Sequence, residues 1–582
     1  MFAIQFVAGQ RRAMQMSVVV EQLKESRLAI RDVVRSRPLR RLNLALVGSV
    51  IGDWAFAVAF SVAAYNSGGA TALGVISVVR YVTMAVLAPF VATLADRFDR
   101  RVVMISADLL RVVLVLAAAM VVFADGPALA VYALSILVGI VGLVFRPAQA
   151  AILPSLATTP TQLSAANVAS STINSVGFFV GPAVAGLLLA VADVGMVFVF
   201  DAMTFVWSAV MVMGIHRADG APAGDDASTD PHAHLDESDS EPDGADHVGG
   251  MFAGVGDGYR AILGNRDLRL IVLLYVAQTI VAGCSVVYEV AIALDLLGLQ
   301  DSGVGVLNSA LGIGGLIGGF VALVMSQRGR LARDFGTGVA LWAAPLLLVV
   351  AVPSLPSALI AMMLIGVGNS VVDVNAETII QRLVPDDVLG RVFGALDSAA
   401  IGGMALGAGL MPLLIATVGL RSGLFVIAVG VTALVLVSTR GLAHVDRTAL
   451  VPEGLESLLA VPMLAVLPEH VIERLARTSA QVSVPAGRVV FQQGDEGDLF
   501  YIVESGEVEV SRVGQPVARL GEGGSFGEIA LLRDVPRTAT VVAITDVVAR
   551  TIERRHFLAA VTGHADASEQ AELVVGRHMD AF

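Results

Sequence analysis

Two ionisable side chains near the end of the chain, Glu528 and Arg537, stand nine residues apart in FGEIALLRDVPRTAT (Phe526–Thr540). The Gly-Glu pair should open a short helix whose free N–H groups attract an anion. Arg537 supplies a permanent cation with a fork of donors that suits a phosphate, and Glu528 can accept hydrogen bonds from a sugar hydroxyl. These residues predict a site for a nucleotide whose phosphate is folded back onto its ribose.

This stretch closely resembles the phosphate-binding cassette of cyclic nucleotide-binding domains, FGE-(L/I)-A-L-x…P-R-(T/A/S)-A. Upstream, Pro485–Val510 is similar to the first strands and glycine turns of that family's β-roll. The resemblance implies that Glu528 holds the ribose 2′-hydroxyl and that Arg537 neutralises the cyclic phosphate. Backbone groups of Gly527, Glu528 and Ala539 would donate to the phosphate. The candidate ligand-binding residues are Gly527, Glu528, Ile529, Ala530, Arg537, Thr538 and Ala539.

Thr538 does not decide which base the nucleotide carries. Some members of the family use a hydroxyl at this position to favour guanine, but Ser or Thr also occurs there in adenine binders. We therefore expect cyclic AMP or cyclic GMP as a regulatory ligand. The alternative is a barrel that binds nothing, and the presence of both charged ligand residues favours binding.

The composition indicates that most of the chain lies in a membrane. Its 582 residues are 56% hydrophobic with a mean hydropathy of +0.77, too apolar for a soluble protein of this size. The single cysteine, Cys284, excludes a disulfide framework and a cysteine-ligated metal site, and we expect no metal. The sequence has no basic patch with interleaved aromatic residues, which is the pattern that would indicate nucleic acid as a partner.

About twelve apolar segments have the length of roughly 20 residues that a bilayer demands. Six lie between residues 43 and 215 and six between 268 and 440, separated by an acidic stretch that we expect to be disordered. We expect six regions: an N-terminal cytoplasmic amphipathic segment (1–41), a six-helix half (42–218), the acidic linker (219–250), a second six-helix half (251–440), a tether (441–453) and the nucleotide domain (454–582).

Arginines gather in the even-numbered loops between these segments, for example Arg97, Arg217 and Arg328. Because positive residues stay on the cytoplasmic side, both termini and the nucleotide domain should be cytoplasmic. We expect a multi-pass protein in the lipid bilayer of a bacterial inner membrane. Whether it is a monomer or a dimer is open.

Two local motifs resemble those of the major facilitator superfamily. ATLADRFDRR (Ala92–Arg101) is similar to that family's G-x-L-a-D-R-x-G-R-R loop, and GFFVGPAVAG (Gly177–Gly186) is similar to the Gly-Pro motif of its antiporters. Ala92, Asp99 and Ala185 depart from these patterns, and DR-x-DRR followed by ADLLR resembles the branch with drug and siderophore exporters. The resemblance implies a membrane all-α, twelve-helix fold followed by a small cytoplasmic β-roll with flanking helices.

The same motifs imply residues at a cytoplasmic gate. Asp96 would cap or salt-bridge a neighbouring helix end, while arginines anchor the cytoplasmic face. Gly and Pro in the fifth segment would permit close packing and a bend. The candidate gate residues are Asp96, Arg97, Arg100, Arg101, Gly181 and Pro182.

A charged residue inside a membrane span costs free energy, so each such residue is a candidate for function. Asp53 lies in the first segment, and Arg80 could be its partner across the cavity. Asp201 and Glu289 also sit at membrane depth. For proton coupling we favour Asp53 and Glu289, because a carboxylate in an apolar cavity can titrate near neutral pH. The alternative for each is a buried structural ion pair.

Asp108 and Arg111 lie a turn apart in the third segment, and we expect them to pair with each other. A structural role is the favoured interpretation of this pair.

Three functions fit these features. The first is a secondary transporter, a proton-coupled exporter of amphipathic small molecules that is regulated by the cyclic nucleotide. The second is a lipid or lysolipid translocase on the same fold, and the third is a sensor that no longer transports. An enzyme finds no support, because the sequence shows no nucleophile elbow and no nucleotide-hydrolysing phosphate loop.

Overall fold

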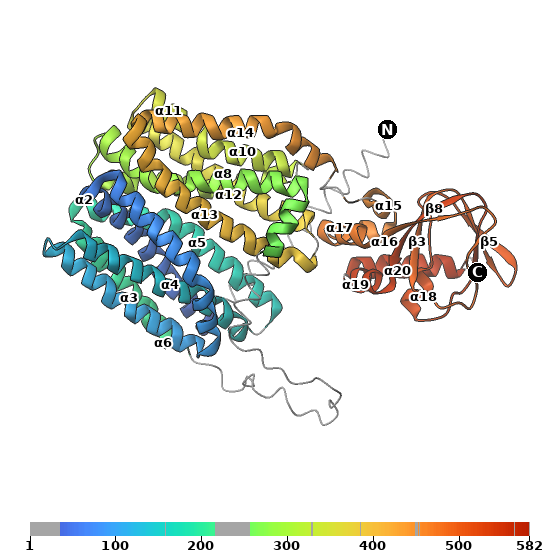
Figure 1. Cartoon of the computed structure of the whole chain (residues 1–582). Coiled ribbons are helices and arrows are strands. Elements are labelled where there is room, and N and C mark those ends of the chain that lie inside the picture. The colour runs from blue at the N-terminus through green and yellow to red at the C-terminus, as the bar shows by residue number, and fades with distance from the viewer. Residues whose placement is uncertain are drawn as a thin grey trace. The chain divides into compact units, whose positions relative to one another are not determined.

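The computed structural model describes residues 35–157, 159–215, 256–326, 330–384, 386–448, 452, 454–563 and 565–580. The chain forms two compact units, Met1–Asp446 and Arg447–Phe582. The first unit is helical and the second combines strands with short helices (Figure 1). Most of the expected N-terminal amphipathic segment and all of the acidic linker lie outside the described residues.

The first half of the helical unit contains α2 (Arg37–Arg97), α3 (Arg100–Phe123), α4 (Ala128–Leu156), α5 (Pro160–Val191) and α6 (Val194–Met213). Helix α2 holds two of the predicted segments, because Gly68 and Gly69 leave helical geometry between them. Gly69 has φ 62°, a conformation that favours glycine. The break separates the first two of the expected apolar segments.

The second half contains α8 (Arg266–Ala291), the π-helix η1 (Ile292–Leu296), α9 (Ser302–Ser326), α10 (Leu331–Ala343), α11 (Leu346–Ala351), α12 (Leu355–Leu383), α13 (Asp386–Val418) and α14 (Leu420–Thr448). Across the described residues, 11 helical stretches are long and apolar enough to span a membrane. Helices suit this setting because they satisfy their own backbone hydrogen bonds. The expected all-α membrane fold is confirmed.

Helix α14 corrects one expected boundary. It continues past Arg440 to Thr448, so the first part of the expected tether is helical. The buried Asp446 side chain accepts hydrogen bonds from the Ala332 and Arg333 backbone N–H groups, at 2.8 and 3.4 Å. Asp446 therefore fixes the end of α14 to the start of α10.

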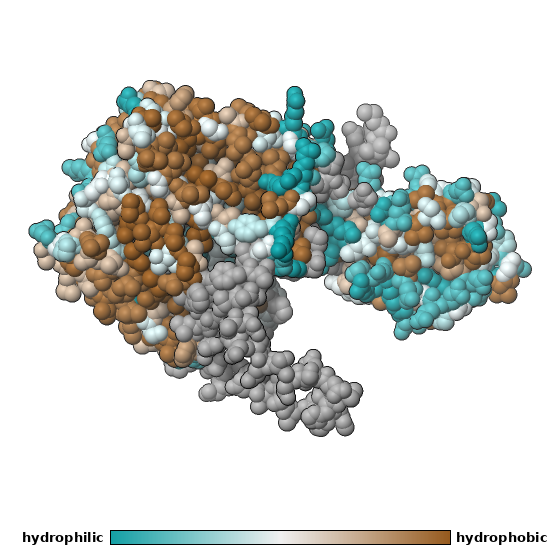
Figure 2. Space-filling view, viewed as in Figure 1, coloured by the Kyte–Doolittle hydropathy of each residue, from teal (hydrophilic) through white to brown (hydrophobic). Residues whose placement is uncertain are grey.

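The helices of each half lie together, and the two halves meet along α5 with α9 and along α2 with α13 (Figure 1). Glycines bring the backbones close, since a Cβ on Gly186 would lie 3.2 Å from the Cα of Gly305. Hydrophobic residues cover much of the visible face of this unit (Figure 2). Such a surface suits a lipid environment.

The second unit begins with α15 (Leu455–Leu459), α16 (Pro462–Ala465) and α17 (Glu469–Thr478). Eight strands follow: β1 (Ala480–Val484), β2 (Val489–Phe491), β3 (Leu499–Ser505), β4 (Val508–Arg512), β5 (Gln515–Leu520), β6 (Ser525–Phe526), β7 (Thr540–Ala543) and β8 (Val547–Glu553). They form two antiparallel four-stranded sheets, ordered β1-β8-β3-β6 and β2-β7-β4-β5. Helix α18 (Glu528–Arg533) interrupts the strands, and α19 (Arg554–Thr562) and α20 (Ala565–Asp580) follow them. The expected β-roll with flanking helices is confirmed.

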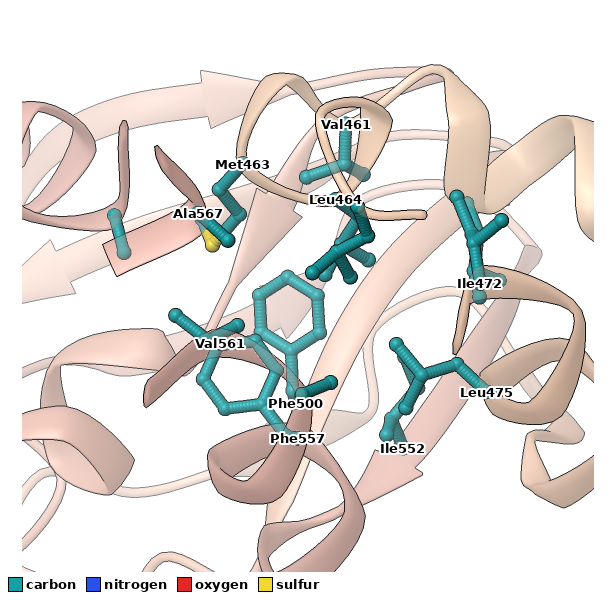
Figure 3. Packing of buried hydrophobic residues seen from close by; sticks show 14 of the residues in the cluster. Val461, Met463, Leu464, Ile472, Leu475, Phe500, Ile552, Phe557, Val561 and Ala567 are labelled. Atoms are coloured by element: carbon teal, nitrogen blue, oxygen red, sulfur yellow. The ribbon is translucent and has the colours of Figure 1, made fainter. Parts of the chain in front are cut away.

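Two hydrophobic clusters hold this unit together. One fills the space between the sheets and includes Val508, Phe526 and Val541. The other joins the flanking helices to β3 and β8, where the rings of Phe500 and Phe557 stack with centroids 4.6 Å apart (Figure 3). The helices before and after the strands thus share one core with the sheet.

Candidate functional site

Gly527 sets the geometry of the predicted ligand-binding stretch. It follows β6 with φ 93° and is the N-cap of α18, the short helix that the Gly-Glu pair was expected to open. A Cβ at this position would lie 2.6 Å from Nη1 of Arg537 and 3.1 Å from the carbonyl oxygen of Leu499. Only glycine fits here without displacing the arginine. The next residue, Glu528, is 1% exposed.

Arg537 is a buried cation, 4% exposed. Its Nη1 and Nη2 donate to the carbonyls of Gly527 and Leu499, at 3.0 and 2.8 Å, and its Cζ lies 4.1 Å from the ring centroid of Phe491. Burial lowers the pKa of the Arg537 guanidinium, an effect that nearby anionic groups oppose. Among the described residues, its buried Nε finds no acceptor. The side chain is held at both Nη atoms, and its Nε is left without an acceptor.

A loop upstream of β3 holds the backbone of Arg537. The Arg537 N–H donates to the Asp495 carbonyl at 2.8 Å, and the Gly494 N–H donates to the Arg537 carbonyl at 2.9 Å. A Cβ on Gly497 would lie 2.8 Å from the Cβ of Ala530 and 3.2 Å from Nε of Arg537. The glycines of this loop therefore let it approach the arginine closely.

All seven predicted ligand-binding residues line one pocket, which encloses about 500 Å³ of empty space that is partly open to solvent. Its remaining lining was not predicted and is mostly apolar: Phe491, Val510, Ala518, Leu520, Ser525, Phe526 and Val541. Alternation along the strands would mark these side chains as inward-facing, but it does not show that they share a cavity.

In the helical unit, Asp99 caps α3. Its side chain accepts from the N–H groups of Arg101 and Val102, at 2.9 and 3.1 Å. Asp96 was expected to cap or salt-bridge a neighbouring helix end; the side chains of Asp96 and Arg97 lie outside the described residues, so that expectation stays a prediction. The residue that departs from the superfamily's loop pattern is thus the one that satisfies this helix end.

Arg100 and Arg101 reach carbonyl groups of other helices. Arg100 Nη1 donates to the Ala151 carbonyl on α4 at 2.8 Å. Arg101 donates to the carbonyls of Val212, at 3.3 Å, and Met213 at the end of α6. Cations at a helix C-terminus are favourable, so these arginines tie three helices together.

Gly181 and Pro182 lie inside α5, where it crosses α2. A Cβ on Gly181 would lie 2.8 Å from the Ile51 carbonyl and would crowd Trp54. A Cβ on Gly305 of α9 would lie 2.7 Å from the Pro182 carbonyl. The Gly-Pro pair therefore stands at close contacts both within and between the two halves.

Asp53 pairs with Arg111, and this corrects two expectations. Arg80 was the expected partner of Asp53, but its Nε lies against α4, 3.8 Å from where a Cβ of Gly139 would be. Arg111 was expected to pair with Asp108 on its own helix. The rotation of each helix about its axis decides which side chains meet, and spacing along one helix does not reveal it.

The other two predicted carboxylates lie apart from each other. Asp201 on α6 is fully buried, with Oδ1 3.4 Å from the Thr204 hydroxyl. Glu289 is buried on α8 in the second half, within reach of the Ser285 hydroxyl and the Asn308 amide. The structure brings Asp201 towards Asp53 and leaves Glu289 separate.

Two family models match this chain. The model of the Major Facilitator Superfamily matches residues 42–333 and 274–467, which is more than half of the chain. The chain belongs to the major facilitator superfamily. The model of the cyclic nucleotide-binding domain matches residues 481–564, so this superfamily member carries a cyclic nucleotide-binding domain after its transporter.

The similar proteins match either the nucleotide domain or the membrane part of the chain. A cAMP-dependent protein kinase regulatory subunit of Yarrowia lipolytica is 42% identical over 102 residues, which are 17% of this chain and 27% of that protein. One of Aspergillus niger is 37% identical over 114 residues, 19% of this chain and 28% of that protein. The chain thus spans little more than a quarter of the length of these curated relatives.

A solved structure of a POT family transporter in complex with 5-aminolevulinic acid is similar to the membrane part. It has a TM-score of 0.55 and 12% sequence identity, and the match covers 70% of this chain and 97% of that chain. At this identity the likeness shows the fold alone. The superfamily member described here is therefore a multi-pass membrane protein with a transporter fold.

Proposed function

We propose that this chain is a proton-coupled exporter of amphipathic small molecules, regulated by a cyclic nucleotide that binds in the Arg537 pocket. The observation that carries the proposal is the buried Arg537 beside the buried Glu528 in one pocket, within a chain whose larger part is a superfamily transporter. A buried cation and a buried carboxylate suit the phosphate and the ribose of one ligand.

In this proposal the nucleotide replaces the present acceptors of Arg537. The guanidinium donates to the carbonyls of Gly527 and Leu499, and a phosphate is a stronger acceptor because it is charged. Nε of Arg537 is a further donor for the anion. Backbone N–H groups of Gly527, Glu528 and Ala539 complete the phosphate site, and Glu528 receives the ribose hydroxyl.

The proposed setting is a bacterial inner membrane with both termini and the nucleotide domain in the cytoplasm. Arg100 and Arg101 support this orientation, because they bind helix ends at the face where the superfamily's arginine loop lies. The two curated relatives of the nucleotide domain reported above are named as cAMP-dependent, so cyclic AMP is the first ligand to test and cyclic GMP the second.

Calorimetric titration of the full chain in detergent with each nucleotide tests the binding step. Arg537→Ala should weaken binding by about 10- to 150-fold, because a hydrogen bond to a charged group contributes about 1.5–3 kcal/mol. Arg519→Ala is the matched control, since Arg519 pairs with Glu509 at 3.1 Å and does not line the pocket. Equal affinity of wild type and Arg537→Ala would rule out this pocket as the site.

Export is tested in vesicles with ethidium as the amphipathic probe, with and without cyclic AMP and with and without a proton gradient. Flux that needs the gradient and changes with cyclic AMP in wild type, but not in Arg537→Ala, supports the proposal. Nucleotide binding without flux would favour a sensor that no longer transports.

One observation favours a lipid or lysolipid translocase as the second candidate. An apolar groove lies between α2 and α13, lined by residues that include Val75, Val79, Pro412 and Leu413. Val75 and Leu413 are exposed, as expected of side chains that face lipid tails. Gradient-independent movement of a fluorescent lysolipid between leaflets would support this function over export.

A further inference from the structure

Three aspartates from three helices surround one arginine inside the first half of the transporter. Asp53 comes from α2, Asp108 and Arg111 from α3, and Asp201 from α6. We name these four residues the aspartate cluster. Asp108 and Asp201 are both fully buried, and Arg111 is 4% exposed. The cluster deepens the proposed proton coupling, on which the following inference rests.

The helices that carry the aspartate cluster pack closely around it. A Cβ on Gly52 would overlap the Asp201 carboxylate and the Thr204 hydroxyl, so α2 and α6 touch beside Asp53. The Arg111 guanidinium lies over the Phe205 ring of α6, with Cζ 3.8 Å from the centroid. Arg111 therefore bridges α3 to both α2 and α6.

The cluster carries more negative than positive groups. The charges that act on Asp108 are Arg111 and Asp53, and those that act on Asp201 are Asp53, Arg111 and Asp108. Among the described residues, both carboxylate oxygens of Asp108 and Oδ2 of Asp201 find no hydrogen-bond partner of normal geometry, although the Ser208 hydroxyl lies near Asp108. Arg111 pairs with Asp53, whose side chain is 44% exposed, so no second cation of the described helices neutralises the two fully buried carboxylates of Asp108 and Asp201.

Among the described residues of α4 and α5, no side chain supplies a compensating charge. Helix α5 has no ionisable residue, and the charged residue of α4, Arg146, bonds to Asn174 at 3.1 Å. Arg80 lies against α4, with its Nε 3.8 Å from where a Cβ of Gly139 would be. Positive charge from solution must complete the site, because unpaired charge at membrane depth is costly.

We infer that Asp108 and Asp201 each hold a proton in this state, and that the aspartate cluster is the proton-coupling centre of the transporter. A proton fits better than a metal ion. In the described part of the chain no group of His, Cys, Asp or Glu side chains has the arrangement to hold a metal. The guanidinium on Asp53 would also repel a metal cation.

Proton loss gives the cluster two arrangements. Arg111 and Asp108 are three residues apart on α3 and share one face. While Asp108 is protonated, Arg111 pairs with Asp53 of α2. When the Asp108 carboxyl releases its proton to water, its carboxylate attracts Arg111, and the bridge between α2 and α3 opens. The protonation state of Asp108 thereby controls the contact between α2 and α3.

Tryptophan fluorescence of the full chain in nanodiscs tests this inference without substrate or nucleotide. The chain has three tryptophans, and Trp342→Phe leaves Trp54, beside Asp53, and Trp207, beside Ser208. In this background we expect emission to change as pH rises from about 5 to about 9, a range in which shifted carboxyl groups titrate. Asp108→Asn and Asp201→Asn should each remove at least half of that change.

Two further variants keep the test decisive. Asp108→Glu retains a titratable carboxyl and should restore the response with a shifted midpoint. Asp193→Asn, at the start of α6 and outside the cluster, should leave it intact. A response that survives both Asn variants, an absent response in the parent, or a response to sodium chloride but not choline chloride at fixed pH would overturn the inference. None of these results depends on export or nucleotide binding, so a failure here is distinct from a failure of the proposed function.

Discussion

Among the single residues of the nucleotide domain, the buried Arg550 forms an ion pair with the partly buried Glu504. Their side chains are 8% and 15% exposed, and Arg550 Nε lies 2.6 Å from Glu504 Oε1. Ser457 and Gln481 also donate to this carboxylate, at 2.8 and 2.7 Å. Burial alone would raise the pKa of Glu504, but the hydrogen bonds from Arg550, Gln481 and Ser457 lower it more.

The lowered pKa of Glu504 predicts a dependence of stability on pH. The pair stabilises the folded domain above the ordinary pKa of a glutamate, and this stability is lost as pH falls through the folded value. Glu504→Ala should cost about 3–5 kcal/mol at neutral pH, because it leaves a buried arginine without its partner. Hydrogen exchange of the β3 and β8 amides in the full chain measures this. Exchange in the variant should respond less to acid than exchange in wild type, and an equal response would contradict the prediction.

At the scale of elements, the Asp446 side chain connects the end of α14 to the start of α10. It accepts from two backbone N–H groups of α10 and pairs with Arg333, whose Nε lies 2.8 Å away. Asp446→Ala should destabilise the helical unit by about 0.5–2 kcal/mol, the usual effect of losing a helix cap. Thermal unfolding in detergent measures the loss. Asp446→Asn keeps an acceptor and should recover part of it; a variant as stable as wild type would contradict this role.

The helices and the ligand pocket show how much of the structure could be predicted from the sequence. Hydropathy located the spans, because a bilayer imposes a length of about 20 apolar residues on each. It did not locate the end of α14, since a helix held by Asp446 continues beyond the apolar residues. The Glu528–Arg537 spacing led to one pocket because both residues lie in one local loop and helix. The Asp53–Arg111 pair could not be predicted from the sequence, because it depends on how two separate helices are rotated about their axes.

At the scale of the whole molecule, regulation requires that the nucleotide bind one transporter conformation better than another. The conformation seen here has contacts between its halves that can be weakened separately. Tyr65 of α2 donates to Asp295 of η1, and Asn66 Nδ2 lies 3.2 Å from Asp301 before α9. These contacts belong to the end of the first span that the proposed orientation places outside the cytoplasm.

Weakening these contacts should change nucleotide affinity if the two units are coupled. Tyr65→Phe removes a hydrogen bond to a charged group, worth about 1.5–3 kcal/mol, and so shifts the conformational equilibrium by at most about 10- to 150-fold. By linkage, the affinity of the full chain for cyclic AMP changes by no more than this factor. Calorimetric titration compares wild type with Tyr65→Phe, and Tyr132→Phe, on α4, is the control that leaves Asp295 paired. Identical affinities in all three would mean that the nucleotide domain binds its ligand without acting on the transporter.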